Sequence, residues 1–469
     1  INALLISSVV CMQQKRWDDA EKLLVKGNDL YPGKLGFLSN LGRLYILRGD
    51  TAKAVGPLQQ AVLLAPDNHG NKNALTGAYF TCAFQAFDET TKKAMTLCLE
   101  DPNLPHPSMA NAWMGFLLLD PAMAPLLALF DSPDYESFSK NIDIAALTDA
   151  FNNPLLLAGI KRILLINPRL ECGLTWLRRW LFEHHPLPDS DAAAIRPFLY
   201  ILARYCFFTE YAFFVTQDEQ KEIDGFSPAA DDEDAIALYA CYKPLHTAQN
   251  HEAFIKAAND PAFQHLITQQ ITEPLTERAI QKDIETITPI DDKISRAVQG
   301  QYEESPYPRW TTTGSPPLPE VTKEKARGKQ ILVAGCGTGR EPAELALHFP
   351  YAHITAVDLS QASLSYGIRK SREMGITNID FRQGDILALK DIERRFDMIT
   401  SCGVLHHMDD PVAGWQSLLS ILAPGGIMKI ALYSKTARHF ITEAREMIAQ
   451  QKLGDTPEDI RAFRQWIQP

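Results

Sequence analysis

Three alternating glycines, Gly335, Gly337 and Gly339, lie in the stretch ILVAGCGTGREP, between an apolar run and a segment with helical spacing. Glycine permits positive φ values and lets a ligand approach bare backbone. A turn of this kind between a strand and a helix is suited to holding a nucleotide-like cofactor. The dinucleotide-binding fingerprint is G-x-G-x-x-G, and here the last glycine comes one residue early, with Arg340 in its place. The spacing therefore argues against NAD.

A carboxylate follows the turn at the expected distance. Asp358 ends the apolar run ITAVD, and 358 − 339 = 19 residues separate it from Gly339. In a βαβ unit an acid at this place reaches ribose hydroxyls, and NAD would accept the same residue. Three further runs predict strands: NIDFRQGDI, which carries Gly384 and Asp385, then RFDMITSCGVLHHM, and LAPGGIMKIALYS with a turn at 424–426.

In order and spacing these segments resemble class I S-adenosylmethionine-dependent methyltransferases over residues 326–469, with VAGCGTG, VDLS, GDI, FDMITSCGVLHH and APGG as the matching motifs. The resemblance implies a Rossmann-like α/β domain that takes S-adenosyl-L-methionine as cofactor and needs no metal. Strand four ends in SCGVLHH rather than N/D-P-P-Y, so amide and adenine-amine acceptors are disfavoured. The chain also looks similar to bacterial fusions of tetratricopeptide repeats with such a domain.

The resemblance implies a cofactor-binding role for these residues: Gly335, Cys336, Gly337, Gly339, Asp358, Leu359, Asp385, Ile386, Cys402 and Gly403. The glycines would pass beneath the methionine part, whose carboxylate would meet N–H groups at the helix start. Asp358 would accept from both ribose hydroxyls, and Asp385 with Ile386 would hold the adenine. Cys402 and Gly403 would end the strand that faces the reacting methyl group.

Two pairs of side chains are candidates for the reaction itself. An amine or hydroxyl acceptor needs a base, and His406 and His407 are the nearest candidates. The alternative is that VLHH begins a packed helix, with one histidine at the edge of the site. Tyr302 and Tyr307 are candidate lid residues whose ring faces would close over the sulfonium.

These tyrosines belong to an aromatic, proline-rich strip, residues 301–319. Its prolines at 306, 308, 316 and 317 rule out one continuous helix, so we expect an extended segment. The aromatics predict that it lies against something, either the ligand site or a surface between domains.

A repeat precedes this region. LYP ends at Pro32 and LAP at Pro66, and 66 − 32 = 34, the length of a tetratricopeptide unit. The second unit fills the repeat positions with Leu38, Leu41, Gly42, Tyr45, Ala54, Leu58, Ala61 and Pro66. Small residues let the paired helices approach closely, and the proline ends the second helix. A weaker unit ends near Pro102. Such arrays bind peptides or partner proteins, or they buttress a neighbouring domain.

The fold class expected is therefore multidomain, with an all-α tetratricopeptide-like N-terminal part and an α/β Rossmann-like methyltransferase domain. We place the repeats at 1–104, a helical middle domain at 105–292, the connecting strip at 293–325 and the methyltransferase domain at 326–469. Five strands are counted where the resembled family has seven, and C-terminal truncation is one interpretation of the shortfall.

Composition limits the partners. A net charge of −11 argues against non-specific binding to nucleic acid or to an anionic membrane. The 8 cysteines form no C-x-x-C pair, which fits reduced thiols and a cytoplasmic location. The first hypothesis is a methyltransferase whose repeats recruit a protein or peptide acceptor. The alternatives are a small-molecule methyltransferase and a non-catalytic scaffold that binds the cofactor. The sequence does not identify the acceptor, the methylated atom or the oligomeric state.

Overall fold

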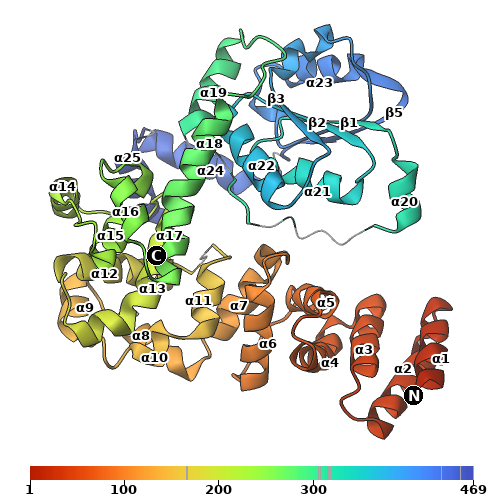
Figure 1. The fold of residues 1–469 in the computed structure, drawn as a ribbon, viewed down its shortest axis with the longest axis horizontal. Helices are drawn as coiled ribbons and strands as arrows, with labels where there is room; N and C mark the ends of the chain where they lie inside the picture. Colours follow the sequence, from red (N-terminus) through yellow and green to blue (C-terminus); the bar gives the residue numbers. More distant parts are fainter. Residues whose placement is uncertain are drawn as a thin grey trace. The chain divides into compact units, whose positions relative to one another are not determined.

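The computed structural model describes residues 1–164, 167–304, 306, 308–311, 313, 318–434, 436–454 and 456–467 (Figure 1). Within it the chain forms two compact units, Ile1–Gln270 and Ile271–Pro469. Residues 271–292, which the sequence analysis assigned to the middle domain, make their contacts within the second unit. The expected boundaries near 104, 292 and 325 otherwise stay predictions.

The first unit is helical throughout its described residues. Its α-helices are α1 (Asn2–Gln13), α2 (Trp17–Leu30), α3 (Leu35–Arg48), α4 (Thr51–Leu64), α5 (His69–Tyr79), α6 (Glu89–Glu100), α7 (Ala110–Leu117), α8 (Ala124–Phe130), α9 (Tyr135–Asn141), α10 (Thr148–Phe151), α11 (Pro154–Ile160), α12 (Pro168–Glu183), α13 (Asp189–Phe208), α14 (Gln217–Gly225), α15 (Glu233–Ala240), α16 (His251–Ala257) and α17 (Pro261–Ile267). Short helical turns lie at His106–Met109, Pro121–Met123, Leu245–Thr247 and Thr268–Thr272.

The helices α1 to α6 follow one another as hairpins (Figure 1). Small residues are required where neighbouring helices meet: a Cβ on Gly27 would lie 2.1 Å from the Phe37 ring, and one on Gly42 would lie 2.4 Å from Leu58. Helical hairpins with such close contacts agree with the expected local structure. That they are tetratricopeptide repeats stays a prediction.

The C-terminal half of α13, from Tyr200 to Phe208, is apolar and mostly buried. Across the described chain, no single helix is both long and apolar enough to cross a membrane; one bent pair, His106–Leu117 with Pro121–Phe130, reaches that length and composition only together.

The second unit holds the parallel sheet. Its strands are β1 (Gln330–Ala334), β2 (His353–Asp358), β3 (Ile379–Gln383), β4 (Phe396–Cys402) and β5 (Leu422–Ala431). Its helices are α18 (Glu273–Gln281), α19 (Lys293–Glu304), α20 (Glu320–Lys325), α21 (Arg340–His348), α22 (Gln361–Glu373), α23 (Pro411–Ser420), α24 (His439–Gln450) and α25 (Pro457–Ile467), with short turns η5 (Ile386–Asp391) and η6 (Leu405–His407).

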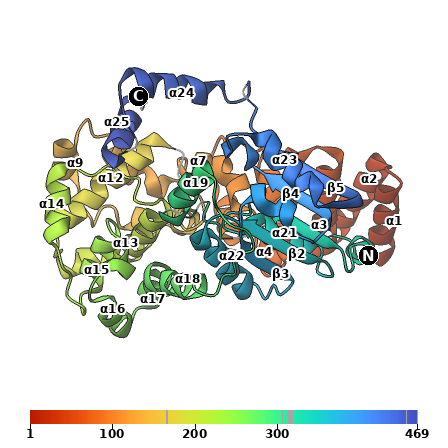
Figure 2. The ribbon, with the colours of Figure 1, turned by 90° about the horizontal axis from the view of Figure 1, so that it is seen from above.

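All strand pairs are parallel, in the order β3-β2-β1-β4-β5, so β3 and β5 are the two edges (Figure 2). Side chains alternate between the faces of a strand. On β1, Ile331 and Val333 pack on the side of α21 and α22, whereas Leu332 and Ala334 pack toward η5 and α23. Both faces of the central strands are thus covered, which explains why they are apolar without interruption. This is the Rossmann-like arrangement that the sequence predicted.

Ion pairs join α18 to α22. Arg369, which is only 7% exposed, lies 2.8 Å from the Glu277 carboxylate and 3.1 Å from that of Glu273. A guanidinium this deeply buried needs carboxylate partners, and both come from α18. The contact fixes α18 on the sheet's helical layer.

The aromatic strip differs in part from the expectation. Residues 301–304 form the end of α19 rather than an extended segment. The first proline of the strip is Pro306, so no proline interrupts the helix before Glu304. Residues 308–310 have no regular secondary structure, in line with the prediction.

Candidate active site

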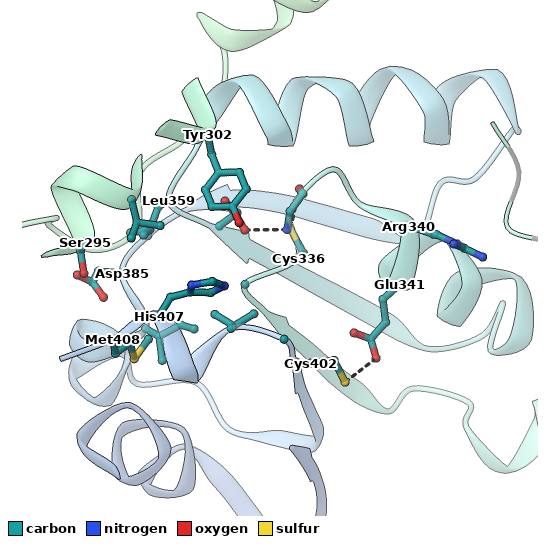
Figure 3. A pocket seen from close by; sticks show the side chains of 18 of the residues that line it. Ser295, Tyr302, Cys336, Arg340, Glu341, Leu359, Asp385, Cys402, His407 and Met408 are labelled. Atoms are coloured by element: carbon teal, nitrogen blue, oxygen red, sulfur yellow. Dashed lines mark hydrogen bonds between the residues drawn. The ribbon is translucent and has the colours of Figure 1, made fainter. Parts of the chain in front are cut away.

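A cavity of 560 Å³ opens at the carboxyl ends of the strands (Figure 3). Its size is that of a small-molecule or cofactor site. All the predicted cofactor-binding residues except Gly339 line it, and so do Tyr302 and His407. The lining residues that the sequence analysis missed are Ile294, Ser295, Val298, Pro308, Arg340, Glu341, Glu344, Gly384, Val404, Met408, Lys429 and Tyr433.

The glycine turn is held in a conformation that needs glycine. Gly335, Gly337 and Gly339 have φ values of 75°, 52° and 82°, all in the left-handed region. A Cβ on Gly335 would lie 2.4 Å from Val404. A Cβ on Gly339 would lie 2.8 Å from the Cα of Gly367 in α22, so this third glycine serves helix packing and not the cavity wall.

Asp358 ties the end of β2 to this turn. Its Oδ2 accepts the Gly337 N–H at 2.7 Å and its Oδ1 accepts the Ser360 N–H at 3.0 Å. Burial raises the pKa of this carboxyl, while the backbone donors work in the opposite direction. A carboxylate has about four acceptor positions, so these backbone donors leave some acceptor capacity for a ligand in the cavity.

Asp385 follows β3 and is 2% exposed. Its Oδ1 accepts the Leu387 N–H at 2.9 Å, and its own N–H donates to Thr288 Oγ1 at 2.7 Å. Thr288 is a positioning residue that no sequence motif indicated, because it lies 97 residues away along the chain. The second carboxylate is therefore as firmly placed as the first.

Helix α19 forms one wall, through Ile294, Ser295, Val298 and Tyr302. The carboxylate of Glu303 anchors it to α22 by accepting the N–H groups of Gln361 and Ala362 at 2.7 and 3.0 Å. Ser360 Oγ also donates to the Tyr302 carbonyl at 3.0 Å. These bonds satisfy free N–H groups at the start of α22, and they place Tyr302 at the cavity.

The strip beyond α19 contacts the glycine turn. Trp310 is 4% exposed, and its indole N–H donates to the Thr338 carbonyl at 2.8 Å. Tyr366 donates to the Trp310 carbonyl at 2.6 Å. Pro308 lines the cavity. The expectation that the strip borders the ligand site is thus met by Tyr302 and Pro308, whereas Tyr307 lies outside the described residues.

The two histidines of η6 have different surroundings. His407 is exposed and lines the cavity. His406 does not line it. Its ring lies tilted by 39° against the Tyr433 ring, with 3.9 Å between centroids, and its two nitrogens are buried with no hydrogen-bond partner in the part of the chain that the structure describes. Partial desolvation and the neighbouring Arg438 and Arg445 lower the pKa of His407, which favours the neutral imidazole. Of the two, only His407 is placed to take a proton from a ligand.

Three polar side chains, those of Cys402, Glu341 and Lys429, lie close together at the cavity wall next to β4 and β5. The Cys402 thiol lies 3.7 Å from Oε1 of Glu341, and Lys429 Nζ lies 3.4 Å from the same oxygen. Figure 3 shows Glu341 reaching from α21 toward Cys402. Burial and Glu341 raise the pKa of Cys402, which keeps it a neutral thiol.

Comparison with known proteins identifies the domain around this cavity. The family model described as "Methyltransferase domain" matches residues 325–464. These residues form a class I S-adenosylmethionine-dependent methyltransferase domain. The predicted cofactor, S-adenosyl-L-methionine, is confirmed with it. The methyltransferase domain includes every strand of the sheet but not α19, which precedes the matched range.

Three curated relatives each match between 24 and 34% of the chain. An uncharacterised protein of Synechococcus sp. is 32% identical over 178 residues, covering 34% of this chain and 42% of that protein. The ubiquinone biosynthesis O-methyltransferase of Marinobacter nauticus is 30% identical, covering 30% and 59% respectively. The trans-aconitate 2-methyltransferase of Deinococcus radiodurans is 31% identical, covering 24% and 46%. The chain thus spans about half the length of these relatives.

A solved structure of an S-adenosylmethionine-dependent methyltransferase from Geobacter sulfurreducens with S-adenosyl-L-homocysteine is 17% identical, covers 33% of this chain and 53% of its own, and has a TM-score of 0.21. The sequence family, rather than this likeness, identifies the methyltransferase domain.

The cavity of the methyltransferase domain fits the cofactor chemically. Asp358 has free acceptor positions at the end of β2, where ribose hydroxyls are expected, and Asp385 and Ile386 lie one strand further along at β3. Glycines leave the backbone at the end of β1 uncovered, next to the first N–H groups of α21. The strand order therefore arranges the residues predicted for adenine, ribose and methionine one after another along the carboxyl edge of the sheet.

Proposed function

We propose that this chain transfers a methyl group from S-adenosylmethionine to a side chain of a protein or peptide, which the helices α1 to α6 recruit. The observation that supports methyl transfer is the cavity itself, in which Asp358, Asp385 and the glycine turn meet at the ends of neighbouring strands. The helical hairpins that precede the methyltransferase domain support a macromolecular partner. Neither nucleic acid nor a membrane enters the proposal.

When bound, the cofactor supplies an electrophilic methyl group on a positively charged sulfur. The chain's own part is alignment and proton removal. Asp358 accepts hydrogen bonds from ribose hydroxyls, and Asp385 accepts one from the exocyclic amine of adenine. Tyr302 covers the cavity from α19. Holding donor and acceptor in line supplies about 7 to 11 kcal/mol of the barrier reduction in well-oriented reactions.

His407 is the proposed base for an acceptor that must lose a proton. It lines the cavity, and its lowered pKa leaves a free lone pair at neutral pH. His406 has a different proposed role: packed against Tyr433, it keeps that ring at the cavity wall. The Arg438 guanidinium also lies over the Tyr433 ring, 3.7 Å from its centroid. With these two contacts Tyr433 can serve as a fixed wall for the acceptor.

A small-molecule acceptor is the second candidate. It is favoured by the names of relatives at about 30% identity, one a ubiquinone biosynthesis O-methyltransferase and one a trans-aconitate methyltransferase. A third hypothesis, a scaffold that binds the cofactor without turnover, follows from the same cavity if no acceptor exists.

Incubation of the full chain with cell lysate and S-adenosylmethionine labelled in its methyl group tests these hypotheses. The products are separated by size, and the large fraction is treated with protease. Label in protease-sensitive material supports the first proposal, and label in small molecules supports the second. No label, together with calorimetric binding of S-adenosylhomocysteine, would leave only the scaffold. Asp358→Ala serves as the control that must lose all transfer.

A further inference from the structure

Two arginines close to the cavity, Arg438 and Arg445, have no carboxylate partner. Both belong to the region of α24, the first helix after β5. Neither forms an ion pair with any carboxylate in the described part of the chain. By contrast, Arg340 and Lys429 line the cavity and have carboxylate oxygens 3.1 and 3.4 Å from their nitrogens. The charges of Arg438 and Arg445 are therefore available to a ligand.

Arg438 is held next to the cavity by an aromatic ring. Its guanidinium carbon lies 3.7 Å from the centroid of the Tyr433 ring, and Tyr433 lines the cavity. The ring of His407, which also lines the cavity, lies 6.5 Å from the same centroid. A guanidinium packed over a ring keeps the N–H groups at its edge free, and these match the two oxygens of a carboxylate. Arg438 is thus positioned to bind a planar anion beside the proposed base.

The start of α24 favours an anion at the same place. Arg438 directly precedes this helix, and no side chain caps its first N–H groups. The N-terminus of a helix carries a partial positive charge, so a cation there is unfavourable unless an anion accompanies it. Arg445 lies about two helical turns later on the same face. An anion bound at Arg438 would therefore be attracted by two guanidinium groups and by the helix.

We propose that Arg438 binds a carboxylate of the methyl acceptor, with Arg445 as a second and more distant attraction. The inference rests on the proposed function and deepens it, because it names the chemical class of acceptor for the same cavity. The carboxylate serves as a handle, and the group that is methylated is another part of the acceptor, which reaches His407. Acidic side chains of a peptide and small carboxylic acids share this chemistry.

The alternative is that Arg438 only supports the Tyr433 ring by a cation–π contact. Removal of the guanidinium would then affect neutral and anionic acceptors alike, and lysine would replace arginine with little loss. The net charge of the chain, −11, works against non-specific binding of acidic molecules. An acidic probe that binds must therefore meet a local positive site, and a matched neutral probe distinguishes the two explanations.

The experiment is calorimetric titration of the full chain, saturated with S-adenosylhomocysteine, with three probes. The first is a peptide of alternating glycine and glutamate with both ends capped. The second is the same peptide with glutamine in place of every glutamate, and the third is glutarate. S-adenosylhomocysteine is first titrated alone, so that cofactor binding is measured separately from probe binding. Circular dichroism and thermal melting confirm that every variant is folded.

The native chain is expected to bind the Gly-Glu peptide and not the Gly-Gln peptide. Arg438→Gln should weaken the Gly-Glu peptide about 10- to 100-fold, the range for one hydrogen bond between charged groups. Arg438→Lys should recover only part of this loss, because an ammonium lacks the planar fork. Arg445→Gln should cost less, about two- to fivefold. Arg372→Gln is the matched control, because Arg372 is an exposed arginine of α22 that does not line the cavity.

The third probe distinguishes the sources of the carboxylate. Tighter binding of the Gly-Glu peptide than of glutarate would support the proposal with a peptide as acceptor. Tighter binding of glutarate would support it with a small carboxylic acid as acceptor. In both cases Arg438→Gln must weaken the probe that binds more tightly.

Equal affinity for the Gly-Glu and Gly-Gln peptides would overturn the proposal, and so would an affinity that Arg438→Gln leaves unchanged. Equal losses in Arg438→Gln and Arg372→Gln would do the same, as would a loss for S-adenosylhomocysteine as large as that for the peptide. A chain that binds S-adenosylhomocysteine but none of the three probes would overturn this inference and leave the proposed function standing. A chain that does not bind S-adenosylhomocysteine would instead overturn the proposed function, and the inference with it.

Discussion

Replacing Gly335 by alanine tests whether the glycine turn is shaped by Val404. The φ of Gly335 is 75°, and a Cβ there would lie 2.4 and 2.5 Å from the two methyl groups of Val404. A left-handed conformation costs a residue with a Cβ about 1 to 2 kcal/mol, and overpacking costs about 1 to 3 kcal/mol. We expect Gly335→Ala to destabilise the methyltransferase domain by about 2 to 5 kcal/mol.

The second variant, Val404→Ala, separates these two costs. It removes both close methyl groups and leaves only the Val404 Cβ, 3.0 Å from the new atom. In the double variant the backbone strain persists, but most of the overpacking is relieved. The coupling energy of the cycle should therefore be about 1 to 3 kcal/mol in favour of the double variant.

Hydrogen exchange of peptides from β1 and β2 is the appropriate assay. The chain has two compact units, so a single unfolding transition would not report on one of them alone. Additive effects, with coupling below about 0.5 kcal/mol, would refute the argument that Val404 dictates glycine at this position. A stable Gly335→Ala variant would refute both parts of it.

Three further outcomes are expected. The rate of methyl transfer should rise with pH, with a midpoint below the ordinary histidine pKa of about 6.5, and should be constant above pH 7, because desolvation, Arg438 and Arg445 lower the pKa of His407. Arg445→Gln should move this midpoint to higher pH. A pH profile that His407→Gln leaves unchanged would exclude His407 as the base. Glu303→Ala should cost about 1 kcal/mol of helix capping and weaken S-adenosylhomocysteine binding, because two N–H groups of α22 lose their acceptor. Burial lowers the pKa of His106 to about 4. The first unit should therefore keep its free energy of unfolding above about pH 6.5 and lose about 2 kcal/mol of it by pH 5. Urea titrations at pH 7 and pH 5 measure this loss, and His106→Gln should remove the difference in stability between the two pH values.

Local sequence patterns were sufficient to predict the strands of the sheet. β1 and β2 are short, mainly apolar runs that end in a glycine turn or an acid, and β3 and β4 lie in segments with recognisable motifs at their ends, so β1 to β4 and the residues at their ends were found from the sequence. Gly335, Asp358 and Asp385 line the cavity because neighbouring parallel strands bring their carboxyl ends to one edge. Strand order was not needed to name them.

Residues that act from other elements could not be found in this way. Thr288 positions Asp385 from 97 residues away. Lys429 lies on β5 and meets Glu341 on α21, 88 residues earlier. Such pairs leave no periodic signal in one sequence. The two histidines illustrate a finer limit: His406 and His407 are adjacent, yet the turn η6 directs one toward Tyr433 and the other to the cavity.

The hydrogen bonds of the Asp358 carboxylate hold the backbone that shapes the cavity. It accepts backbone N–H groups from both the glycine turn and the start of the segment that leads into α22. Removing it would leave the N–H groups of Gly337 and Ser360 without their acceptor and would release the turn, in addition to deleting the proposed ribose contact. Loss of binding in Asp358→Ala would therefore not measure a ligand contact alone.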